Sequence, residues 1–298
     1  MAYLVHHRRS SALLAPLLTI ALCSMVLLSA CTTTGGAGQE GVDAATNQAS
    51  PEAAARAEQS YIRGNTLLEQ GRHREAISTY TAAINLNPNH SAAYENRGIA
   101  WIKEKNFYKA LDDFEIALEL GEENARLYYN LGNVYARTAR MEPAIKAYSR
   151  SLELDPDQMG ALNNLGNCYA AMDRFEEAIS TFEEMARRYP DRPEAYNNIG
   201  AVYEAMAKPP RAEACYQHAI RVDADHPAAY FNLGSMFASK RQFSASISYY
   251  EQYLEHAPDA PDRAKIEGRL TKLRSQTGVQ DLTRTRSKGS AQCLSATQ

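Results

Sequence analysis

The sequence lacks the motifs on which catalysis, metal binding and nucleotide binding usually depend. Its 298 residues include five cysteines and seven histidines, and the histidines form no HExxH pair and no Cys/His cluster. It contains no GxGxxG motif, no P-loop and no nucleophile elbow. We therefore expect a protein that is not an enzyme, with no metal site, no cofactor and no small-molecule substrate.

Acidic and basic side chains are also nearly balanced in number. The net charge is -3, whereas a dedicated nucleic-acid binder usually has a strongly basic domain, so we expect no nucleic-acid partner. The charge is unevenly spread, because residues 262–298 hold eight basic and three acidic residues while residues 31–261 are net acidic. The basic end is consistent with a solvated tail, or with a contact to anionic lipid or an acidic partner.

The N-terminus has the pattern of a secretory signal. Arg8 and Arg9 are its only charged side chains, and an apolar run follows over residues 12–28. The run ends in Leu28-Ser29-Ala30-Cys31, which resembles the lipobox of bacterial lipoproteins. An uncleaved membrane helix ending near residue 30 is the alternative, because about 17 apolar residues lie at the lower limit for spanning a bilayer.

The lipoprotein resemblance implies several properties of the mature chain. Residues 1–30 would be removed, and Cys31 would carry the acyl chains, palmitate among them, that anchor the protein to a membrane. Thr32 stands where an Asp would favour retention at the inner membrane, so the resemblance implies the outer membrane of the cell envelope, facing the periplasm. Residues 31–56, rich in Gly, Ala, Thr and Ser, are predicted to be the lipidated cysteine and a flexible tether.

One element recurs every 34 residues. The clearest marker is a glycine that we number position 8 of each repeat: Gly64, Gly98, Gly132, Gly166, Gly200 and Gly234. Position 20 is alanine in five repeats and Ser246 in the sixth, and position 24 is always Tyr or Phe. Small residues at positions 8 and 20 allow two helices to approach closely, and the aromatic ring fills the groove beside them.

This period and these columns resemble the tetratricopeptide repeat (TPR) family. The resemblance implies an all-α fold, a right-handed superhelical solenoid of six helix-turn-helix repeats followed by a capping helix. We assign the repeats to residues 57–90, 91–124, 125–158, 159–192, 193–226 and 227–260. Residues 261–275 are the predicted capping helix, with Ile266, Leu270 and Leu273 packing inward, and residues 276–298 are predicted to be a disordered tail.

Asparagine fills another column. In the TPR family, position 6 faces the concave groove, and position 9 lies beside it. The asparagines in these two columns are Asn65, Asn96, Asn130, Asn133, Asn164, Asn167, Asn198 and Asn232. Asparagine is not favoured within a helix, so its recurrence at one position of five repeats needs a structural or functional explanation. An amide can bind the backbone of an extended peptide, as in TPR arrays that bind peptides with little sequence preference; alternatively, the column is a product of repeat duplication and bridges neighbouring helices.

Together these features predict a membrane-anchored scaffold or adaptor lipoprotein that binds partner proteins through a concave, asparagine-lined groove during envelope complex assembly. Alternatives are a type IV pilus pilotin that aids secretin assembly, an adaptor for peptidoglycan-modifying enzymes or proteases, and an accessory of outer-membrane assembly or lipid trafficking. The groove lacks the Lys/Arg set of TPRs that hold an acidic C-terminus, because position 2 offers only Arg126.

Overall fold

The computed structural model describes residues 50–277, which form thirteen α-helices and no strand. The helices alternate with short turns along the chain. They are α1 (Pro51–Glu69), α2 (His73–Leu86), α3 (Ser91–Lys103), α4 (Phe107–Glu119), α5 (Ala125–Arg137), α6 (Met141–Leu154), α7 (Met159–Ala171), α8 (Phe175–Arg188), α9 (Pro193–Ala205), α10 (Pro209–Val222), α11 (Pro227–Ser239), α12 (Phe243–His256) and α13 (Arg263–Thr277).

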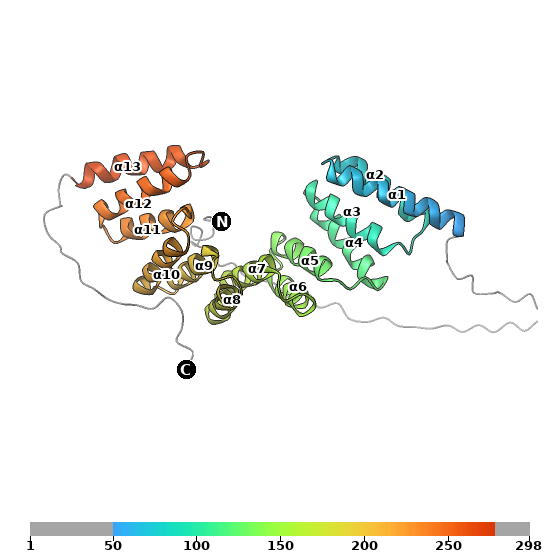
Figure 1. Cartoon of the computed structure of the whole chain (residues 1–298), viewed down its shortest axis with the longest axis horizontal. Coiled ribbons are helices and arrows are strands. Elements are labelled where there is room, and N and C mark those ends of the chain that lie inside the picture. Colours follow the sequence, from blue (N-terminus) through green and yellow to red (C-terminus); the bar gives the residue numbers. More distant parts are fainter. Residues whose placement is uncertain (1–49, 278–298) are drawn as a thin grey trace, which may run out of the picture.

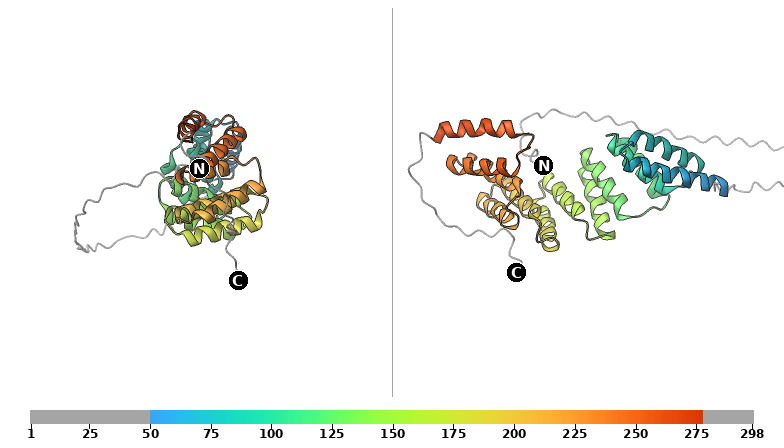
Figure 2. Two further views of the ribbon diagram at one scale, coloured as in Figure 1. Left: turned by 90° about the vertical axis from the view of Figure 1, so that its left-hand side faces the viewer. Right: turned by 45° about the horizontal axis from the view of Figure 1, so that its top comes forward.

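Each odd-numbered helix from α1 to α11 packs against the even-numbered helix that follows it, and α13 packs against α12. Successive pairs stack into an all-α superhelical solenoid (Figure 1). The solenoid is an arch, in which α1 and α13 rise on one side while α6, α7 and α8 form the middle. The right-hand view of Figure 2 shows the same curved stack. Near the middle, α5, α7 and α9 face the opening of the arch, and α6, α8 and α10 lie on its outer side.

The constant spacing between the glycine and the aromatic residue of each helix pair has a direct steric cause. The ring at position 24 lies against the bare Cα of the glycine at position 8, so a Cβ on Gly64 would be 2.5 Å from Cε1 of Tyr80. The same contact recurs in all six pairs, and the six rings are almost fully buried: Tyr80, Phe114, Tyr148, Phe182, Tyr216 and Tyr250. The ring therefore packs on the glycine itself rather than beside it.

The turn inside each pair has one backbone geometry. The residue at position 15 has a positive φ in all six repeats, yet only the first repeat has a glycine there, Gly71. The others are Lys105, Ala139, Asp173, Ala207 and Arg241. In the first turn, the Arg72 amide donates to the Leu67 carbonyl at 2.9 Å, the pattern of a helix ended by a left-handed residue.

Two predicted boundaries were wrong. Helix α1 begins at Pro51, so residues 51–56 are helical instead of tether; the Ser50 hydroxyl accepts from the Ala53 amide at 3.2 Å, and Pro51 suits the first helical turn. Helix α13 begins and ends two residues later than predicted, and Ile266, Leu270 and Leu273 are buried as expected. The signal segment, Cys31, the start of the tether and the tail beyond residue 277 lie outside the described residues.

None of the helices within residues 50–277 is both long enough and apolar enough to cross a membrane.

Candidate functional site

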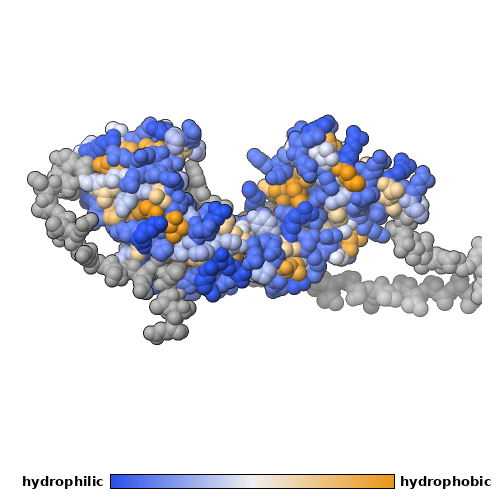
Figure 3. Space-filling model, viewed as in Figure 1, coloured by the Kyte–Doolittle hydropathy of each residue, from blue (hydrophilic) through white to orange (hydrophobic). Residues whose placement is uncertain are grey.

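The solenoid is hollowed on the inner side of the arch, between its N-terminal and C-terminal helices (Figure 3). Odd-numbered helices line this hollow near the middle of the chain, and the predicted asparagines all lie on odd-numbered helices. Asn96 is buried at 6% exposure, and the other seven are half-buried. The asparagines at positions 5, 6 and 9 of these helices form what we call the amide row.

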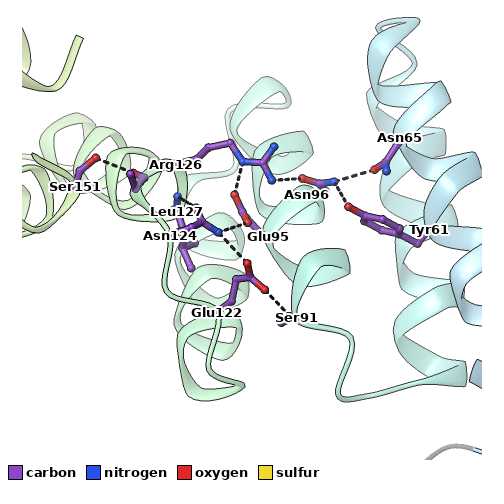
Figure 4. A network of polar contacts seen from close by, with 11 residues as sticks. Tyr61, Asn65, Ser91, Glu95, Asn96, Glu122, Asn124, Arg126, Leu127 and Ser151 are labelled. Carbon is purple, nitrogen blue, oxygen red and sulfur yellow. Dashed lines mark hydrogen bonds and ion pairs between the residues drawn. The ribbon is translucent and has the colours of Figure 1, made fainter. Parts of the chain in front are cut away.

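At the N-terminal end, the amide row links the first two repeats. Nδ2 of Asn96 donates to Oδ1 of Asn65 at 2.8 Å and to the Tyr61 hydroxyl at 3.2 Å (Figure 4). The Tyr80 hydroxyl also donates to Oδ1 of Asn65, at 2.7 Å. Burial raises the pKa of Tyr80, so this hydroxyl is protonated and serves as a donor at neutral pH.

The same bridge recurs further along the chain. Nδ2 of Asn164 donates to Oδ1 of Asn133 at 3.0 Å, and the Tyr148 hydroxyl donates to that oxygen at 2.8 Å. In the next two repeats the acceptor moves from position 9 to position 5. Asn198 donates to Asn163 at 2.8 Å, and Asn232 donates to Asn197 at 2.9 Å. The amide row therefore joins adjacent repeats.

Asn130 differs from the other position 6 asparagines, because no hydrogen bond of its side chain is recorded among the described residues. The preceding repeat explains this. It carries Ile99 at position 9, which offers no acceptor, and Glu95 at position 5, whose carboxylate is already occupied. The side chain of Asn130 is half-buried on α5, one of the helices that face the opening of the arch.

Glu95 is the centre of a buried polar network (Figure 4). Its carboxylate is 1% exposed and accepts from Nε of Arg126 at 2.7 Å and from Nδ2 of Asn124 at 3.1 Å. Nη2 of Arg126 also approaches Oδ1 of Asn96 at 3.4 Å. The hydrogen bond that Arg126 donates to Glu95 raises the pKa of Arg126. The Arg126 guanidinium is therefore bonded to side chains of the preceding repeat, and the predicted groove has no free cation at this position.

Sequence reasoning did not assign a site role to the acceptors Asn163 and Asn197, or to the hydroxyls of Tyr80 and Tyr148. The signal was present in the columns. A Tyr at position 24 accompanies an Asn or Ser at position 9 in three repeats, and the hydroxyl bonds that residue each time. Among residues 50–277, no three His, Cys, Asp or Glu side chains gather as a metal site.

Family models identify the repeats. Models described as tetratricopeptide repeat match residues 125–158, 157–225 and 199–271, and one described as TPR repeat matches residues 64–105. The chain is a tetratricopeptide-repeat protein, with the superhelical fold of that family, which is typically a scaffold for protein–protein interaction.

Solved structures share this fold. YrrB, a TPR protein described as having an unusual peptide-binding site, is 27% identical, with a TM-score of 0.53 over 57% of this chain and 88% of its own. The pilF protein of Pseudomonas aeruginosa is 16% identical, with a TM-score of 0.56 over 73% of this chain and 99% of its own. The C-terminal part of a TPR protein from Cytophaga hutchinsonii is 16% identical, with a TM-score of 0.61 over 72% and 85% of the two chains. No curated protein matches the sequence.

Proposed function

We propose that this protein is a non-catalytic scaffold that binds an extended segment of partner proteins along the amide row, while an acylated Cys31 holds it at the bacterial outer membrane. The observation that carries the proposal is the amide row itself. Asn198 and Asn232 each have one recorded hydrogen bond among the described residues, and Asn130 has none. An amide side chain offers two N–H donors and an oxygen with two lone pairs, so donors and acceptors of these three side chains remain that can bond to a ligand.

The two explanations of the asparagine column are compatible. The bridges between repeats hold the amides in fixed orientations along the inner face, and the remaining donors and acceptors match the backbone of an extended peptide. The likeness to YrrB supports this proposal, because that protein is described as having a peptide-binding site and is 27% identical.

The membrane anchor rests on the lipobox, Leu28-Ser29-Ala30-Cys31. A single acyl chain gives only marginal membrane binding, whereas the several chains of a lipoprotein would hold the protein stably. Labelled palmitate tests the anchor. We expect it to be incorporated into the wild-type chain and lost in Cys31→Ala, and incorporation that survives this substitution would show that the anchor is elsewhere.

A pilotin for a type IV pilus secretin remains the specific alternative, supported by the six repeats behind a lipobox. The likeness to pilF concerns the fold alone, at 16% identity. An adaptor for peptidoglycan-modifying enzymes or proteases would use the same groove, so both roles share the proposal of a peptide-binding scaffold.

Selection from a library of short random peptides tests the groove. We expect the wild-type chain to enrich peptides, and Asn130→Ala to weaken their binding about fivefold, since one neutral hydrogen bond contributes about 1 kcal/mol. Lys146→Ala, at an exposed site on α6, is the matched control and should leave binding unchanged. Enrichment of no peptide by the wild-type chain would overturn the proposed function.

A further inference from the structure

The last helix, α13, carries an excess of positive charge. Five of its fifteen residues are basic, and Glu267 is its only acidic residue. Its apolar stripe, Ile266, Leu270 and Leu273, is buried against the preceding repeat. The basic side chains therefore lie on the two flanks of this stripe, and the flanks differ in their partners.

On the first flank, the basic side chains are neutralised by carboxylates. Nε of Arg263 lies 2.9 Å from Oε1 of Glu267, and Nη2 of Arg274 lies 2.6 Å from Oε1 of Glu251 on α12. Both carboxylates are about half exposed, so these two ion pairs lie at the surface.

The second flank carries Lys265, Arg269 and Lys272, which we call the basic strip. Their spacing of four and then three residues places them on one helical face. Nη1 of Arg269 donates to the Tyr250 hydroxyl at 3.2 Å, and that hydroxyl lies 3.0 Å from Oγ of Ser235 on α11. The basic strip therefore faces the side of α11 on which the amide row runs. Within residues 50–277, no ion pair is recorded for its three members.

Helix α12, which packs against α13, carries Glu251 and Glu255, and Glu251 pairs with Arg274 on the first flank. Among the odd-numbered helices that precede α13, neither α11 nor α7 contains a charged residue, and the carboxylates of α9 are Glu194 and Glu204. The three basic residues also occupy positions 5, 9 and 12 of the repeat register, where α5 has Tyr129, Asn133 and Ala136. At these three positions, α5, α7, α9 and α11 carry a single charged side chain, Glu204, so the amide-lined surface ends in three cations in the same register.

We propose that the basic strip binds acidic side chains near one end of the peptide that the amide row holds, and so sets the direction of that peptide. This inference rests on the proposed function. Lys265 and Arg269 are four residues apart, or about 6 Å along the helix, and Lys272 lies about 4.5 Å further on. Alternate side chains of an extended peptide lie about 6.6 Å apart, so two acidic residues separated by one residue match the spacing of Lys265 and Arg269.

The experiment compares peptides selected by the full chain, solubilised in detergent, with those selected by the Lys265→Gln, Arg269→Gln, Lys272→Gln triple variant. We expect Asp and Glu to be enriched at one end of the wild-type peptides. We also expect the triple variant to bind them about tenfold more weakly, as for two exposed ion pairs. The matched control removes three charges elsewhere, by Arg263→Gln, Arg274→Gln and Lys146→Gln, and should keep the preference.

The outcomes separate the two proposals. Two outcomes would overturn the inference about the basic strip and leave the proposed function standing. Either the selected peptides show no preference for acidic residues, or that preference survives in the triple variant. Selection of no peptide by the wild-type chain would overturn both. Cosedimentation of the Cys31→Ala chain with phosphatidylglycerol vesicles tests lipid as the occupant: vesicle binding that needs the strip, with no acidic preference in the peptides, would also overturn the inference.

Discussion

A methyl group on Gly132 would lie 2.5 Å from Cε1 of Tyr148, closer than carbon atoms approach without contact repulsion. Tyr148 is 1% exposed, and its hydroxyl is bonded to Asn133, so the ring has little freedom to move. The contact joins the packing of each repeat to the amide row, because the side chain that covers the glycine also holds an asparagine of the inner face.

Gly132→Ala should therefore destabilise the protein, although alanine favours a helix by about 1 kcal/mol over glycine. We expect a net loss of about 1–3 kcal/mol in the free energy of unfolding, as for overpacking of a core. Chemical denaturation followed by circular dichroism measures it.

Gly268→Ala is the matched control. Gly268 continues the same 34-residue spacing into α13, but nothing lies within 4 Å of the position that its Cβ would take. Alanine should there stabilise the protein by up to about 1 kcal/mol. Equal effects of the two substitutions would contradict the packing argument.

The turns offer a second stability prediction. Ala139 has a φ of 59°, a left-handed conformation that costs a residue with a Cβ about 1–2 kcal/mol. Ala139→Gly should raise the free energy of unfolding by about 0.5–1 kcal/mol after the added entropy of the unfolded chain is counted. Ala82→Gly, at an exposed site within α2, should lower it by about 1 kcal/mol, and a loss of stability at both sites would refute the prediction.

Substitution of two asparagines of the amide row should affect the stability of the fold to different extents. Asn96 is buried and bonded to Asn65 and Tyr61, so Asn96→Ala should lower the free energy of unfolding by about 1–3 kcal/mol. Asn130→Ala should change it by less than about 0.5 kcal/mol, since no bond within the described residues is lost. Denaturation of the two variants and titration with a selected peptide check this contrast, which fails if Asn130→Ala unfolds the protein or binds normally.

Stability should depend on pH near neutrality. Burial lowers the pKa of His226, an effect that Glu194 and Asp223 oppose only in part. The folded state then binds fewer protons than the unfolded state, so the free energy of unfolding falls as the pH drops below the ordinary histidine value of about 6.5.

The His226→Asn variant should show a shallower fall in stability over this range. Some slope will remain, because burial also lowers the pKa of His218. Denaturation at a series of pH values measures both slopes, and an unchanged slope in the variant would exclude His226 as a source.

The repeat period and the packing columns could be predicted from the sequence because each glycine faces an aromatic ring sixteen residues later, within one helix pair. Because each such contact lies within one repeat, the same residue types recur at the same two positions and the contact can be predicted from the sequence. The same logic correctly predicted burial of Ile266, Leu270 and Leu273.

The partners of the asparagines could not be predicted in the same way. A column shows that Asn130 and Asn164 share a helical face, but the bond of each depends on the preceding repeat, which offers Ile99 to the first and Asn133 to the second. The start of α1 was missed because an alanine-rich segment after Pro51 has no apolar period, although Ser50 and Pro51 form a good helix start. Composition alone did not distinguish that helix from a tether.

Photocrosslinking tests the central claim most directly. A benzoylphenylalanine at position 130, on the inner face, is compared with one at position 146, exposed on α6, using a peptide selected by the wild-type chain. The account predicts a covalent product at position 130 and none at position 146. A product at position 146 alone, or none at position 130 while the peptide still binds, would contradict the assignment of the inner face as the binding surface.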